Sequence, residues 1–170
     1  ASALAGIDVA VPFADLIVEA LSGPAAAQSG DPISAAWRVR NLGNSPTAVA
    51  GCVDRIVLSA DGLLDGSDAE LARISHSGVL ANGASYTAQS PVTLPDGISG
   101  DFHLFAVTDF GNAVFESTFE DNNVGRTLQP IAVTLKPAPD LQVSDVTAPP
   151  AGQPGQSVQV QWAVTNAGPG

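Results

Sequence analysis

The amino-acid sequence predicts an all-β fold, an immunoglobulin-like two-sheet β-sandwich of seven to eight strands. The 17 glycines and 13 prolines of the 170-residue chain recur at short intervals, which breaks up helices and favours short strands joined by turns. Several segments alternate apolar and polar residues with a period of two, and the clearest of them occurs twice. These features are typical of a sandwich in which each strand has one buried face.

The clearest strand is centred on Trp37. Apolar side chains occupy every second position of it, at Ile33, Ala35, Trp37 and Val39. Because one face is apolar, we expect Trp37 in the core between the sheets rather than on a sugar-binding surface. In chain order, the other strands are expected at 14–21, 52–60, 69–75, 84–94, 101–109, 112–117 and 126–135, with turn-forming segments between them.

The sequence repeats itself without a gap at an offset of 125 residues. The aligned pairs include Asp15 with Asp140, Trp37 with Trp162, and Asn41 with Asn166. Chance does not align a rare Trp, a strand pattern and turn residues together, so the repeat indicates a tandem array.

The repeat divides the chain into three parts. We expect residues 1–12 to be the last strand of a preceding repeat, 13–137 to be a complete repeat, and 138–170 to be the first two strands of the next, truncated repeat. The apolar face of that last part lacks the sheet that should cover it. We therefore expect residues 139–170 to pair or swap with another chain, or with the 1–12 strand of a neighbour.

The charge of the chain narrows the classes of partner. With 17 acidic and 6 basic residues the formal net charge is −11, which disfavours nucleic acid and anionic membrane surfaces. No apolar stretch approaches the roughly 18–20 residues of a membrane span, and the first residues lack the basic region of a signal peptide, so we expect a piece of a longer protein. The acidic composition and the single Cys52 favour an exported bacterial protein, extracellular or at the cell surface.

Two acidic clusters are candidate calcium sites. The first cluster comprises Asp61, Asp65, Asp68 and Glu70. Carboxylates on a Gly-containing loop can surround calcium, although this spacing is not that of an EF-hand. The alternative is a solvated hairpin loop in which Asp and Gly serve the turn geometry.

The second cluster follows the strand expected at 101–109. Its candidate ligands are Asp109, Asn112, Glu116, Glu120 and Asn123. These carboxylates and amides can also bind calcium. The alternative is that the side chains accept hydrogen bonds from backbone N–H groups of their own loop.

Catalytic patterns are missing from the sequence. There is no GxSxG nucleophile turn, no zinc-ligand spacing, no phosphate loop and no dinucleotide fingerprint. Of the two histidines, we expect His103 to be a partly buried structural residue and His76 to be exposed. Cys52 lies in an apolar strand and is expected to be a small core residue. We therefore expect no enzymatic activity.

Three segments together resemble the cell-adhesion-related domain found in bacteria, CARDB. They are PDLQVSDVTAPPAGQPGQSVQVQWAVTNAGPG, DRIVLSADGLLDGSD and FAVTDFGNAVFESTFEDNN. The family's motif D-x-x-N-x-V-x-E-x-x-E-x-N-N falls here on Asp109, Asn112, Val114, Glu116, Glu120, Asn122 and Asn123, with a looser spacing between the two Glu. The resemblance implies a seven-stranded immunoglobulin-like fold, repeated along large secreted or surface-anchored bacterial proteins that serve adhesion or spacing.

Two functions follow as hypotheses. The first is a non-catalytic structural or adhesion spacer, stiffened by calcium and packed against neighbouring repeats of the same chain. The second is a carbohydrate- or ligand-binding accessory module attached to a secreted enzyme, which needs exposed aromatic side chains. The candidates for that surface are Tyr86, Phe110, Phe115 and Phe119.

Overall fold

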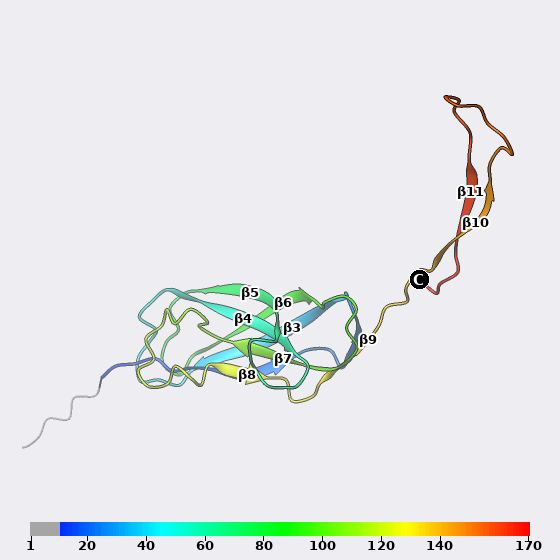
Figure 1. Cartoon of the computed structure of the whole chain (residues 1–170). Coiled ribbons are helices and arrows are strands. Elements are labelled where there is room, and N and C mark those ends of the chain that lie inside the picture. The colour runs from blue at the N-terminus through cyan, green and yellow to red at the C-terminus, as the bar shows by residue number, and fades with distance from the viewer. Residues whose placement is uncertain (1–10) are drawn as a thin grey trace, which may run out of the picture. The chain divides into compact units, whose positions relative to one another are not determined.

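The computed structural model describes residues 11–170 and divides the chain into two units (Figure 1). The first unit ends at Thr134, and the second covers Leu135–Gly170. The strand expected at residues 1–12 lies almost entirely outside the described residues. Within residues 11–170 there is no helix long and apolar enough to cross a membrane.

The first unit is a sandwich of two sheets. The strands of the smaller sheet, in spatial order, are β1 (Leu16–Ser22), β3 (Pro32–Asn41) and β6 (Ser85–Thr93). The strands of the larger sheet, in spatial order, are β2 (Ala26–Gln28), β9 (Ile131–Thr134), β7 (Gly100–Val107), β4 (Gly51–Ser59) and β5 (Ala69–Ser77), and β8 (Val124–Arg126) also pairs with β7. All neighbours are antiparallel except β2 and β9. Seven of these strands have four or more residues, so the predicted fold is confirmed.

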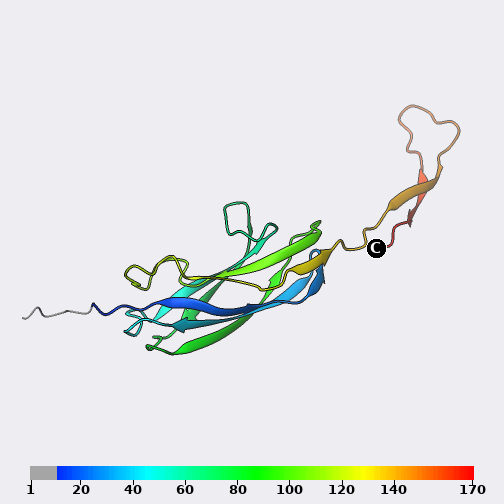
Figure 2. The same cartoon turned by 90° about the horizontal axis from the view of Figure 1, so that it is seen from below.

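The core lies between the two sheets, as the alternation in β3 predicts. Trp37 is 1% exposed and Val39 is fully buried. The larger sheet contributes buried residues of β4 and β7, among them Ile56 and Leu104. Burying apolar surface of this kind stabilises a fold by roughly 25 cal/mol per Å². Figure 2 shows β1 and β3 side by side along the unit.

A carboxylate at the centre of the sandwich joins the two sheets. Asp54 of β4 is 1% exposed and accepts hydrogen bonds from Trp37 Nε1 at 2.7 Å and from Thr108 Oγ1 at 2.8 Å. Tyr86 of β6 donates its hydroxyl proton to the same carboxylate, with oxygen–oxygen distances of 2.7 and 2.9 Å. Burial and the nearby Asp54 charge both raise the pKa of the Tyr86 phenol, which keeps it a donor. A buried charge is tolerated only when it is hydrogen-bonded in this way.

The strand expected at 112–117 is wrong. That segment is part of an irregular loop between β7 and β8. Asp109, Asn112 and Ser117 have φ values of 46°, 48° and 62°, which are incompatible with an extended strand. The expected strand at 126–135 is likewise divided into β8 and β9, with Pro130, which has no N–H to donate, just before β9.

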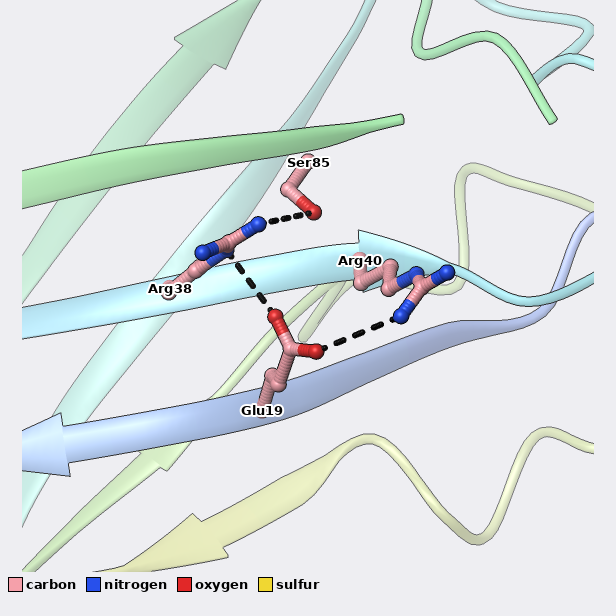
Figure 3. Close-up of polar contacts among 4 residues, drawn as sticks. All are labelled: Glu19, Arg38, Arg40 and Ser85. Carbon is pink, nitrogen blue, oxygen red and sulfur yellow. Dashed lines mark hydrogen bonds and ion pairs between the residues drawn. The ribbon is translucent and has the colours of Figure 1, made fainter. Parts of the chain in front are cut away.

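The outer face of the smaller sheet carries an ion-pair cluster (Figure 3). The register of β1 against β3 shifts between Val18 and Ala20, and Glu19 lies at this bulge. The Glu19 carboxylate contacts Arg38 Nε at 2.9 Å and Arg40 Nη1 at 3.4 Å. Arg38 also donates to Ser85 Oγ on β6, so the cluster connects all three strands.

The second unit is a hairpin of β10 (Leu141–Thr147) and β11 (Gln161–Asn166). Its register repeats that of β1 and β3. Leu141 is opposite Asn166 as Leu16 is opposite Asn41, each 125 positions later. Both hairpins then shift register, the first between Val18 and Ala20 and the second between Ser144 and Thr147. The two hairpins differ in burial, because Trp162 is 62% exposed whereas its counterpart Trp37 is 1% exposed.

We predict that the Asp54 network contributes more to stability than the surface cluster. Tyr86→Phe leaves a buried carboxylate with one donor fewer and should lower the free energy of unfolding by about 1.5–3 kcal/mol. Glu19→Gln removes only exposed ion pairs and should lower it by less than about 1 kcal/mol. Urea denaturation of both variants measures the difference. Equal effects would contradict the role assigned to Asp54.

Candidate functional site

The N-terminal end of the sandwich is fastened by Asn41, the last residue of β3. Its Oδ1 accepts hydrogen bonds from the N–H groups of Asp15 at 3.1 Å and Gly43 at 3.0 Å. Its Nδ2 donates to the carbonyl oxygens of Ser45 and Leu80. Asn41 is completely buried, so one side chain satisfies four backbone groups without water.

Gly43 is required by the same arrangement. A Cβ on this residue would overlap the carbonyl oxygen of Phe13 and the backbone of Ala14. The chain that leads into β1 can therefore approach the turn after β3 only because no side chain is present. Together, Asn41 and Gly43 form what we call the Asn clip.

The second unit contains the same clip. Asn166 Oδ1 accepts hydrogen bonds from the N–H groups of Asp140 at 2.9 Å and Gly168 at 3.0 Å. A Cβ on Gly168 would overlap the carbonyl oxygen of Ala138. The D-L segment at the start of each hairpin and the V-x-N-x-G segment at its end (39–43 and 164–168) therefore build the same backbone junction in both units.

The loop between β4 and β5 holds the first acidic cluster, and its carboxylates serve their own turns. Asp61 Oδ1 accepts from Leu63 N–H at 2.9 Å and from Ser59 Oγ at 3.0 Å. Asp65 Oδ1 accepts from the N–H and the hydroxyl of Ser67, which lowers the pKa of Asp65. These contacts agree with turn chemistry.

The two remaining members of the first cluster are also engaged. Asp68 Oδ2 accepts from the N–H of Asp65 at 2.9 Å. Glu70 lies in β5 and pairs with Arg73, with an Nε–Oε1 distance of 2.7 Å, and this hydrogen bond lowers the pKa of Glu70. Asp61, Asp65 and Glu70 are exposed, and each of the four contacts a different donor group. The loop does not gather them around one point.

The loop between β7 and β8 buries most of the second cluster. Asp109 accepts from the N–H groups of Ala113 at 3.0 Å and Val114 at 2.8 Å, and burial raises its pKa. Asn112 is exposed and lies outside the buried group. Glu116 is fully buried and reaches across the unit to accept from the N–H of Leu16 at 2.6 Å.

Glu116 is the centre of this group. Its second oxygen, Oε2, accepts from Asn123 Nδ2, and Glu120 Oε1 accepts from the N–H of Glu116 at 3.0 Å. Burial raises the pKa of Glu116 to about 7, and the charges of Glu120 and Asp109 contribute to the rise. The structure thus brings together Asp109, Glu116, Glu120 and Asn123, but not Asn112.

Sequence reasoning missed the Asp54 network. The available signal was an Asp in the inward phase of an apolar strand, opposite a buried Trp whose N–H needs an acceptor. Cys52 is buried as predicted, and burial together with the Asp54 charge raises the pKa of its thiol to about 11. His103 is half-buried, as expected, with Nδ1 3.2 Å from the Thr127 carbonyl oxygen.

The predicted exposure of His76 is wrong. Its ring is half-buried and stacks on Tyr86 with a centroid distance of 3.7 Å, because the two strands carrying them come together at this end of the sandwich. The other aromatic candidates are Phe110, Phe115 and Phe119. Phe110 lies under the guanidinium of Arg55 at 4.0 Å, while Phe115 and Phe119 are exposed. Tyr86 and Phe110 are therefore engaged within the unit.

We predict an acid-stabilised fold in the presence of a chelator. The folded-state pKa of Glu116, about 7, is raised above its ordinary value of 4.5, so the native state binds this proton more tightly than the unfolded state. Stability from this group is therefore complete below about pH 4.5 and is lost as pH rises through about 7. Denaturation at several pH values should show a fall of about 2–3 kcal/mol across this window.

The control for this prediction is a pair of neutral variants. Glu116→Gln should flatten the pH dependence of unfolding between these pH values, whereas Glu70→Gln, on an exposed side chain, should leave it unchanged. An unaltered pH profile in Glu116→Gln would show that the measured dependence has another source.

Comparison with known proteins shows similarity at the level of structure. No family model matches the sequence, and a search of the curated proteins found no match either. The crystal structure of the CARDB domain of PF1109 from Pyrococcus furiosus, described in complex with di-metal ions, is 20% identical, with a TM-score of 0.52, and the match covers 75% of this chain and 95% of that chain. The solution NMR structure of the same domain is 21% identical, with a TM-score of 0.50 and coverages of 74% and 100%.

A weaker similarity is to a β-glucosidase from Listeria innocua, at 12% identity and a TM-score of 0.41. The match covers 71% of this chain but only 16% of the enzyme's chain. A similarity this weak says nothing about activity. Both CARDB domain structures, in contrast, match over nearly their whole length. The sandwich described above therefore has the fold of a CARDB domain, as the sequence resemblance predicted.

Proposed function

We propose that this chain is a non-enzymatic spacer module of a large extracellular bacterial protein with an adhesive role. The observation that carries the proposal is the second Asn clip, which joins a hairpin whose first three residue pairs repeat the register of the first hairpin 125 residues later. A backbone junction that recurs at a fixed interval is the property expected of units stacked in series. The CARDB fold supports an adhesion-related module.

The course of the chain through the first unit also supports a spacer. The chain approaches β1 at one end of the sandwich and leaves β9 at the opposite end (Figures 1 and 2). Units with their two connections at opposite ends extend an array instead of folding it back. Such a module separates the domains on either side of it by about its own length.

The proposal includes strand partners for the second unit. Trp162 and Val164 are 62% and 53% exposed, whereas their counterparts Trp37 and Val39 are buried under the larger sheet. In an array this apolar face would be covered by the remaining strands of its own repeat. In the 170-residue chain, a second copy is the available cover, because exposed apolar strands pair with one another.

The proposal also keeps a role for calcium. The PF1109 domain was described in complex with di-metal ions, so a domain of this fold can hold metal. The first cluster fits a cation poorly, since three of its four carboxylates are exposed and each of the four accepts from a different donor group. The β7–β8 loop fits better, because Glu120 Oε2 and Asn123 Oδ1 are buried oxygens with no hydrogen-bond partner.

A chain with two complete units tests the spacer function. Residues 138–170 are replaced by a second copy of residues 13–137, so that the Trp of the second copy again falls at position 162. We expect small-angle scattering to show that the maximum dimension of this two-unit chain exceeds that of a single unit by about one unit length. Both Trp residues should be protected from acrylamide quenching. A compact particle, or a second Trp that remains quenched, would contradict the proposal.

The strand-partner part has its own test. The 170-residue chain should self-associate reversibly in sedimentation equilibrium, because the hairpin exposes an apolar face. Trp162→Ser should weaken the association, whereas Leu128→Ser, which removes another exposed apolar side chain from the first unit, should not. A chain that remains monomeric at all concentrations, or equal effects of the two substitutions, would rule this interface out.

A further inference from the structure

The β7–β8 loop contains two buried oxygen atoms that the protein leaves without a partner. Glu120 Oε2 and Asn123 Oδ1 accept no hydrogen bond, and Asn123 is only 4% exposed. A buried acceptor that is left unsatisfied destabilises the fold. Native proteins rarely leave two such atoms in one loop without a bound water or ion to complete them.

The neighbours of these atoms are acidic. Asn123 lies beside the buried Glu116 carboxylate, to which its Nδ2 donates, and Glu120 Oε1 accepts from the backbone N–H of Glu116. The charges of Glu120 and Asp109 raise the pKa of Glu116, and the charge of Glu120 also raises the pKa of Asp109. Carboxylates buried this closely repel one another, so the group that would stabilise them is a cation.

We propose that Glu116, Glu120 and Asn123 bind a hard divalent cation of the calcium type. The available donors are carboxylate and amide oxygens, which suit calcium, and calcium accepts six to eight oxygen ligands in irregular loops. Within residues 11–170 no group of three or more Asp, Glu, His or Cys side chains is arranged to hold a metal ion. The Asn123 amide therefore has to act as a ligand, and backbone carbonyls and water complete the shell.

The position of the site gives the cation a structural effect. Glu116 accepts from the N–H of Leu16, and Asn122 Nδ2 donates to Asp15 Oδ1 at 2.9 Å, so the loop holds the start of β1. A cation that fixes Glu116 would tighten the same junction that the Asn clip fastens. The structural purpose of the cation rests on the proposed spacer function, because a module that separates domains needs rigid ends. The chemistry of the site does not depend on that function.

The experiment is a calcium titration of the full 170-residue chain after exhaustive chelation. Calorimetry should give saturable binding, and the melting temperature should rise with calcium concentration, because a ligand of the native state stabilises it. Glu120→Gln keeps an acceptor for the Glu116 N–H but loses one charge. It should weaken calcium binding about tenfold or more, since ligand charge sets affinity.

The melting temperature in chelator distinguishes a Glu120 that binds the cation from a Glu120 that only stabilises the fold. In chelator, Glu120→Gln should melt no lower than the natural chain, because the substitution removes a repulsive charge. Asp121→Asn, an exposed carboxylate of the same loop, and Asp68→Asn, in the β4–β5 loop, are matched controls that should bind calcium as the natural chain does.

Two results would overturn the assignment. One is a chelated chain that neither binds calcium nor gains stability from it. The other is calcium binding that survives Glu120→Gln and is lost in Asp68→Asn, which would move the site to the β4–β5 loop. Neither result bears on the length of the two-unit chain in scattering, so failure of the site and failure of the spacer function remain distinguishable.

Discussion

The carboxylate of Asp54 is the constraint on which the sandwich depends. It is buried between the sheets and accepts hydrogen bonds from β3, from β6 and from the residue after β7, so it connects four segments distant in sequence. Apolar packing alone holds two sheets together with little preference for their alignment. A buried charge with three specific donors permits only the arrangement in which all three reach it.

The N-terminal end of the unit is built on the same principle with different groups. There Asn41 and Glu116 each bind backbone N–H groups at the start of β1, and neither is exposed to water. Side chains thus complete hydrogen bonds that the sheet cannot supply where the chain enters. This end combines local turn chemistry with a contact between residues 100 positions apart, and it is where a cation would act.

The sequence predicts the parts of the fold that depend on local periodicity. The inward phase of β3 and the second hairpin follow from alternation and from the repeat, because both are carried by neighbouring residues. The segment 112–117 was expected as a strand because its apolar residues resemble one, yet left-handed residues and the Asp109 carboxylate shape it into a loop. The partners of Asp54 and Glu116 could not be predicted, since they depend on how distant strands meet. For the candidate cation site, sequence composition indicates both loops equally, and only burial separates them.

Amide hydrogen exchange of the 170-residue chain tests whether the start of a unit is held by the buried carboxylate of its own distant loop. Leu16 and Leu141 occupy equivalent positions in two hairpins of the same register, but only Leu16 donates its N–H to Glu116. We expect the Leu16 amide to exchange only on global unfolding and the Leu141 amide to exchange orders of magnitude faster. Similar exchange rates at the two positions would contradict it.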